Sequence, residues 1–315
     1  MKRMLGLILS IIMLLTLAAC SPKPEAAEAP GAATAAPTEP ATEAATEAPT
    51  EPEAVITDLE MDNTVLVDDE NCTFSVQLAS KNEHLGLTLD AQCVNKTDKN
   101  LYFTWNTVSV CGYMYDPLWA EQVPPNATLN STIYIDTYQL EQYGITSVDE
   151  ITFTLHIFDG DDFMAEPFVN EPFTIYPTGL NAETVQYPQR TAVGGEQVIA
   201  DNDDLRFIIE SVEEDSLSYT LRCYAENRTG TSLMFSWDGV TVNSMVIDPL
   251  WAIEVAPGKQ AYSEITFYRS QFEENGIESV GEISFQLTVS DWENWEADYL
   301  LDERFTVRAE DFVVG

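Results

Sequence analysis

The chain has 315 residues, with 53 acidic against 14 basic side chains and a formal net charge of −39 at pH 7. Because like charges repel, this excess of carboxylates makes nucleic acid and anionic lipid surfaces poor partners, and it favours cations and basic proteins. The composition therefore predicts a protein with no nucleic-acid partner.

Residues 1–20 have the pattern of a bacterial lipoprotein signal peptide. Two basic residues precede an apolar stretch over residues 4–17, and Leu-Ala-Ala then leads to Cys20. The apolar stretch is too short to be a membrane span. Its end resembles a lipobox, which implies that the thiol of Cys20 is lipidated and anchors the chain at the extracytoplasmic surface of a bacterial membrane. The alternative is an ordinary secretory signal with an incidental cysteine.

Residues 21–55 contain almost only Ala, Pro, Thr and Glu. A segment with no aromatic residue and few large apolar ones cannot bury enough surface to offset the entropy that it loses on ordering. We therefore expect a disordered tether, which would span about 30 Å as a flexible coil and up to about 110 Å when extended.

The rest of the chain is duplicated. Residues 95–159 align without a gap with residues 227–291, and 27 of the 65 pairs are identical. We therefore predict two domains, residues 56–177 and 197–315, joined by a linker at residues 178–196 that is rich in Pro, Gly and polar residues. Each predicted domain has a net charge of −17.

Within each repeat, hydrophobic residues alternate with polar ones. Residues 72–78 and 85–93 follow this period of two in the first repeat, and residues 205–209 and 217–225 follow it in the second. The pattern predicts antiparallel strands with one buried face. Seven or so short strands in each repeat predict an all-β fold of two tandem immunoglobulin-like β-sandwiches. A β-barrel is the alternative.

The run Asp-Pro-Leu-Trp-Ala occurs once in each repeat. We interpret it as scaffold, in which Trp119 and Trp251 face inward and join the equally repeated Trp105 and Trp237. Buried aromatic side chains contribute much of the energy of a core, and a repeated core reuses them. The alternative is that the two Trp residues of the run contact a ligand.

Several of these features occur together in one known family. The segment Val94–Val110 (VNKTDKNLYFTWNTVSV), the turns Val-Pro-Pro-Asn and Val-Ala-Pro-Gly, the lipobox and the acidic tether resemble bacterial surface lipoproteins with immunoglobulin-like domains, related to the immunoprotective extracellular antigen family. The resemblance covers both repeats. It implies a sandwich fold and no known catalysis, and it supplies no functional residues to transfer.

Two cysteines of the first repeat are candidates for a disulfide. Cys72 and Cys93 lie on the same predicted strand face, and a two-residue turn at Asn82 and Glu83 would place them directly opposite each other. An extracytoplasmic setting permits the bond, which would contribute about 3 kcal/mol by closing the loop between them. The alternative is two buried free thiols.

Acidic residues cluster in the predicted loops. Asp159, Asp161 and Asp162 offer carboxylate oxygens, the ligands that calcium prefers. We therefore consider calcium a possible cofactor at these residues and expect no other cofactor. The spacing of an EF-hand is absent, and the alternative is a solvated turn.

The corresponding loop of the second repeat contains two tryptophans. Its residues are Asp291, Trp292, Glu293, Asn294 and Trp295. Exposed indoles among carboxylates and an amide suit stacking on a sugar or anchoring a protein partner. We predict that these five residues bind a ligand; the alternative is that the rings fold back over the end of the sandwich.

Catalytic motifs find little support in the sequence. The chain has only two histidines, His84 and His156, and no pattern of a His-activated nucleophile or of a zinc site. We therefore expect a non-enzymatic surface protein that recognises a glycan or a protein through loops at the ends of its sandwiches. A calcium-stabilised adhesion or structural module and a cell-wall glycan hydrolase are the alternatives.

Overall fold

The computed structural model describes residues 61, 63–82, 86–294 and 296–312. The predicted signal peptide with Cys20, and the tether, lie outside the described residues, as does Trp295. All described residues belong to one compact unit. Within the described ranges, no helix is both long and apolar enough to cross a membrane.

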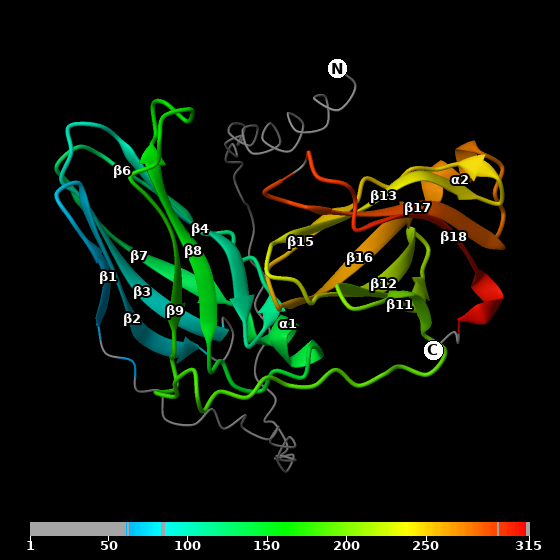
Figure 1. The fold of residues 1–315 in the computed structure, drawn as a ribbon, viewed down its shortest axis with the longest axis horizontal. Helices are drawn as coiled ribbons and strands as arrows, with labels where there is room; N and C mark the ends of the chain where they lie inside the picture. The colour runs from blue at the N-terminus through cyan, green and yellow to red at the C-terminus, as the bar shows by residue number, and fades with distance from the viewer. Residues whose placement is uncertain (1–60, 62, 83–85, 295, 313–315) are drawn as a thin grey trace, which may run out of the picture. The chain divides into compact units, whose positions relative to one another are not determined.

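The described residues form an almost entirely β structure, as Figure 1 shows. The strands up to Ile175 are β1 (Thr64–Asp68), β2 (Cys72–Asn82), β3 (Gly86–Asn95), β4 (Leu101–Val110), β5 (Tyr113–Met114), β6 (Ala120–Val123), β7 (Thr128–Ile135), β8 (Ile151–Asp159) and β9 (Val169–Ile175). We call this part the N-terminal half.

The strands from Gln197 onward form the C-terminal half. They are β10 (Gln197–Asp201), β11 (Leu205–Glu214), β12 (Ser218–Asn227), β13 (Leu233–Val242), β14 (Met245–Val246), β15 (Ala252–Val255), β16 (Gln260–Tyr268), β17 (Glu282–Asp291) and β18 (Leu301–Arg308). Each half also has one short helix, α1 (Thr137–Gln142) or α2 (Arg269–Glu274), and a 3-10 turn, η2, spans Ala309–Asp311. The predicted all-β class is confirmed.

The two halves pair their strands in the same order. In the N-terminal half β2, β3 and β7 are hydrogen-bonded neighbours, and so are β4, β8 and β9. In the C-terminal half β11, β12 and β16 are neighbours, and so are β13, β17 and β18. These pairings are antiparallel. A parallel bridge, Gln260 with Tyr113, connects β16 with β5.

Each half has its own hydrophobic core, and the repeated tryptophans lie in both. The ring of Trp105 stacks on Phe153 with centroids 3.7 Å apart and meets Trp119 edge-on at 5.9 Å. In the C-terminal half Trp237 stacks on a phenylalanine at 3.8 Å and meets Trp251 edge-on at 5.9 Å. The predicted inward orientation of these four indoles is confirmed, because each is at most 7% exposed.

The Trp of each Asp-Pro-Leu-Trp-Ala run also has a polar partner. The indole Nε1 of Trp119 donates to the Oγ of Ser131 at 3.1 Å, and that of Trp251 donates to the Oγ of Ser263 at 2.9 Å. A buried indole N–H costs free energy unless it is hydrogen-bonded, so these serines allow the rings to be buried. In the N-terminal half the Oδ1 of Asp116 accepts the N–H of Leu118 at 2.8 Å, which fixes the start of the run.

The strand register around the two candidate disulfide cysteines differs from the prediction. Cys93 lies opposite Phe74 and Cys72 lies opposite Asn95, because β2 and β3 pair out to Asn82 with Gly86 and β2 carries a bulge. The two cysteines are therefore diagonal neighbours, and both are free thiols in the structure. The predicted directly opposed pair is wrong, and the alternative of two buried thiols describes this strand pair.

Candidate functional site

The loop between β17 and β18 is held by hydrogen bonds at its start. The Oδ1 of Asp291 accepts the backbone N–H groups of Glu293 at 2.9 Å and Asn294 at 3.1 Å. The N–H of Trp292 donates to the carbonyl of Ser232 at 2.9 Å. Asp291 thus acts as a turn-forming residue, and the backbone that carries the indole is fixed on both sides.

The indole of Trp292 is 44% exposed, and Tyr299 in the same loop is 43% exposed. The carboxylate residues Glu293, Glu296 and Asp298 around them are exposed as well. The structure therefore places Trp292, Glu293 and Asn294 at the surface, as predicted, whereas Asp291 is engaged in the turn. An exposed aromatic surface among hydrogen-bond acceptors can stack on a sugar ring or anchor a protein.

The corresponding loop of the N-terminal half, between β8 and β9, also exposes apolar side chains. Phe163 is 68% exposed and Met164 is 94% exposed. The ring of Phe163 lies 6.2 Å from that of Tyr102 and 5.5 Å from that of Phe158, and the last two rings stack at 5.5 Å. This aromatic cluster was not predicted from the sequence, although the outward positions of Tyr102 and Phe158 in the alternating strands could have revealed it.

The three predicted calcium ligands point to separate partners. The Oδ2 of Asp159 accepts the Nζ of Lys99 at 2.7 Å, and this hydrogen bond holds the pKa of Asp159 below its usual value. An oxygen of Asp161 accepts from Asn100 at 3.0 Å, and one of Asp162 accepts the N–H of Met164 at 3.2 Å.

Each of these carboxylates thus has a hydrogen-bond partner within the chain. In the part of the chain that the structure describes, no group of three or more His, Cys, Asp or Glu side chains could hold a metal ion. The structure thus accounts for the three carboxylates by contacts within the protein, and calcium binding at these residues stays a prediction.

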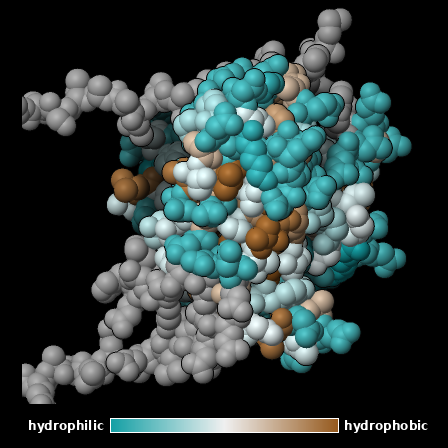
Figure 2. All heavy atoms as spheres, turned by 90° about the vertical axis from the view of Figure 1, so that its left-hand side faces the viewer, coloured by the Kyte–Doolittle hydropathy of each residue, from teal (hydrophilic) through white to brown (hydrophobic). Residues whose placement is uncertain are grey.

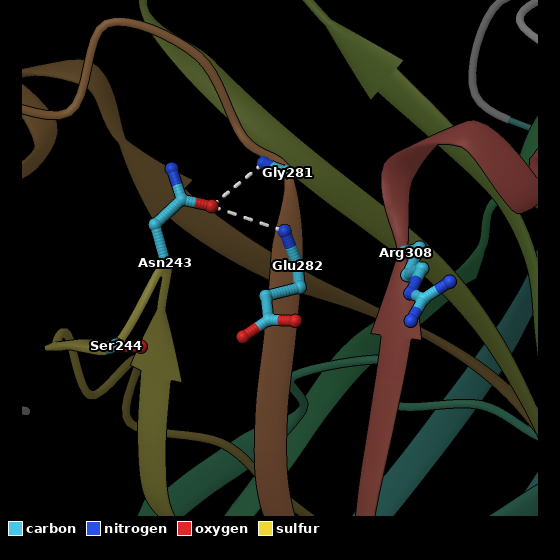
Figure 3. Close-up of a pocket in the computed structure, with 5 residues that line it drawn as sticks. All are labelled: Asn243, Ser244, Gly281, Glu282 and Arg308. Atoms are coloured by element: carbon cyan, nitrogen blue, oxygen red, sulfur yellow. Dashed lines mark hydrogen bonds between the residues drawn. The ribbon is translucent and has the colours of Figure 1, made fainter.

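A shallow hollow of about 340 Å³ lies where β13, β17 and β18 meet the turn before β14. Figure 3 shows its lining residues Asn243, Ser244, Gly281, Glu282 and Arg308. The side-chain oxygen of Asn243 accepts the N–H groups of Gly281 at 2.8 Å and Glu282 at 3.1 Å, and its Nδ2 donates to the carbonyl of Ser279 at 2.7 Å. The side-chain amide thus stabilises the turn at residues 279–282, so we assign a structural role to the residues that line the hollow.

Comparisons with known proteins give no family for the chain. No protein-family model matches it, and no curated protein matches it. Among solved structures, a mutant of the Bacillus subtilis oxalate decarboxylase is 8% identical over 82% of this chain and 81% of that chain, with a TM-score of 0.11. A likeness at that TM-score carries no argument about fold or function.

Proposed function

We propose that the chain is a lipid-anchored bacterial surface protein whose two tandem immunoglobulin-like sandwiches bind a glycan or a protein through the loops at their ends. The lipid anchor at Cys20 and the tether of residues 21–55 would hold the sandwiches away from the membrane. The role is binding or scaffolding rather than catalysis.

The strand order supports the immunoglobulin-like assignment. The neighbours β2, β3 and β7 correspond to strands A, B and E of an immunoglobulin domain, and β4, β8 and β9 correspond to strands C, F and G. The C-terminal half repeats both groups. Strand β1 is an addition that pairs with β2.

The observation that carries the binding role is the placement of apolar side chains in the same loop of both halves. Phe163 and Met164 are exposed in the β8–β9 loop, and Trp292 and Tyr299 are exposed in the β17–β18 loop. Aromatic side chains are enriched where proteins bind partners, because their burial in an interface removes a large apolar surface from water. Loops on a rigid scaffold are also where binding residues concentrate.

Capture by a Trp292→Ala variant tests this proposal. We expect the immobilised full chain to bind at least one member of a panel of purified cell-wall glycans and surface proteins. The variant should bind that partner with a dissociation constant about tenfold or more higher, because a central aromatic anchor of the hot-spot kind contributes about 2 kcal/mol or more. The measurement is the dissociation constant by surface plasmon resonance.

Leu217→Ala provides the matched control. Leu217 is an exposed apolar residue of the same half, in the turn between β11 and β12. This control should leave capture unchanged. If Leu217→Ala weakened capture as much as Trp292→Ala, or if no member of the panel bound, the proposed role of the loop would be wrong.

A further inference from the structure

A second surface of the N-terminal half has the features of a ligand site. A hollow of about 380 Å³ lies on the outward face of the sheet formed by β1, β2, β3 and β7. Its volume falls within the range of about 300–1,000 Å³ that is common for ligand clefts. The lining side chains used below are Ser75, Gln77, Asp90, Gln92, Asn130 and Thr132.

The strand register arranges these side chains in two rows across the sheet. Ser75, Gln92 and Asn130 are directly opposed residues of β2, β3 and β7. Gln77, Asp90 and Thr132 form the next outward row. The Nε2 of Gln92 donates to the Oδ1 of Asn130 at 3.1 Å, so the two amides of the first row are oriented relative to each other.

The chemistry of the hollow differs from that of the surrounding surface. Asp90 is its single carboxylate, in a predicted domain with a net charge of −17. The side-chain amides and hydroxyls each offer both a donor and an acceptor, as the hydroxyl groups of a sugar do. An anionic ligand would meet Asp90 and the field of the domain, which disfavour it. Figure 2 shows that hydrophobic side chains form only small, separate groups on the face that it presents.

In the C-terminal half the corresponding face is covered by other segments of the same chain. With Phe74 aligned on Phe207, the row of Ser75, Gln92 and Asn130 corresponds to Ile208, Tyr224 and Tyr262, which are again opposed residues of three strands. Ile208 and Tyr224 are at most 3% exposed.

Aromatic and cationic groups cover this second row. The ring of Tyr113 stacks on Tyr262 with centroids 5.6 Å apart, and Tyr143 stacks on Tyr262 at 4.8 Å. The guanidinium of Arg190 lies 4.8 Å from the ring centre of Tyr224. The face that these segments cover is thus built from an isoleucine and two tyrosines.

The corresponding row in the N-terminal half has the exposed amides of Gln92 and Asn130 beside Ser75, which is 5% exposed, so it does not suit the same occupant. The residues that would face it in a second copy, at the positions of Tyr113 and Tyr143, are Met245 and Asn275. Such a contact would bury amides without the ring stacking that offsets their desolvation.

From these observations we infer that the hollow over Ser75, Gln92 and Asn130 binds a neutral oligosaccharide. The two rows would hydrogen-bond the sugar hydroxyls, with the partly exposed Tyr134 of β7 at the next outward position of that strand. This site is separate from the loop that contains Trp292 and does not depend on it.

Calorimetric titration of the full chain tests the inference. The neutral probes are hexasaccharides of glucose (α- and β-linked), mannose and N-acetylglucosamine, and the anionic probe is an oligogalacturonate. We expect saturable binding of at least one neutral probe and none of the anionic probe. Gln92→Ala with Asn130→Ala should weaken binding by at least about tenfold, because each hydrogen bond to a polar ligand contributes about 1 kcal/mol. Gln122→Ala, an exposed amide of β6, should have no effect.

A second variant separates loss of the site from loss of the fold. Gln92→Tyr with Asn130→Tyr installs the residues that the C-terminal half carries in the same strands, so it should fold, fill the hollow and abolish binding. Binding that survives either double variant, or no binding of any neutral probe, would overturn the inference. Loss of sugar binding in Trp292→Ala alone would also overturn it, by assigning the sugar to the β17–β18 loop. Self-association of the wild-type chain, if it is lost in the tyrosine variant, would also overturn the inference and would show an interface between copies instead.

Discussion

At the scale of single residues, two buried asparagines stabilise the ends of the strands. The Nδ2 of Asn227 donates to the carbonyls of Thr231 at 2.7 Å and Val255 at 2.8 Å, and its Oδ1 accepts the N–H of Thr229 at 2.8 Å. Asn95 has the same role in the N-terminal half. Both side chains are 1% exposed, so their hydrogen bonds form where water cannot replace them.

Replacing Asn227 by Ala should therefore be costly. The variant leaves two carbonyls and one N–H without their partner, and we expect the free energy of unfolding to fall by about 2 to 4 kcal/mol. A urea titration followed by tryptophan fluorescence measures it. Asn294→Ala is the control, because Asn294 is exposed, and it should change stability by less than about 0.5 kcal/mol. Equal losses in the two variants would contradict the role of Asn227.

At the scale of strands and loops, the sequence predicted which residues face inward but not their register. The period of two places Phe74 and Cys93 on the buried face, and that placement is confirmed. The register depends on the length of the turn after Asn82 and on the bulge in β2, and neither follows from hydrophobic alternation. Asn227 was missed because a polar residue at a strand end resembles a loop residue in sequence.

The candidate sites were predictable to a similar extent. Trp292 was found because it differs from its counterpart in the first repeat. The hollow over Gln92 and Asn130 was missed because β3 pairs with β7, and β4, β5 and β6 lie between these two strands in the sequence, so sequence spacing does not bring the two amides together. An alignment of the outward positions of the two repeats would have shown that the second repeat has tyrosines where the first has these two amides.

Burial of the thiols predicts their reactivity. Burial raises the pKa of Cys72 to about 12, and it raises the pKa of Cys93 and Cys223 as well. Few thiolates then exist at neutral pH, and the thiolate is the reactive form. In a Cys20→Ser background, we expect maleimide to modify none of the four remaining cysteines in the folded chain and all four in urea. Mass spectrometry counts the additions, and only two additions in urea without reductant would reveal a disulfide.

At the scale of the whole molecule, charge opposes the compact state. The chain carries 53 acidic and 14 basic side chains, and the ion pairs in the structure use only some of these carboxylates. Unpaired surface carboxylates repel one another, and salt screens that repulsion over a distance of about 10 Å at 0.1 M.

Added salt should therefore stabilise the protein. We expect the melting temperature to rise by a few degrees, on the order of 1 kcal/mol, between about 20 mM and about 500 mM sodium chloride. Differential scanning calorimetry at pH 7 measures the shift. A fall in the melting temperature would mean that exposed ion pairs such as Lys96 with Asp68 contribute more than the repulsion does.

The central claim is that the repeated indoles are scaffold and that recognition lies in surfaces where the repeats differ. The most direct test compares the unfolding free energies of Trp251→Ala and Trp292→Ala in urea. We predict a loss of about 3–5 kcal/mol for Trp251→Ala, which removes a buried ring, and of less than about 0.5 kcal/mol for Trp292→Ala. Similar losses in both variants, or the larger loss in Trp292→Ala, would contradict the account.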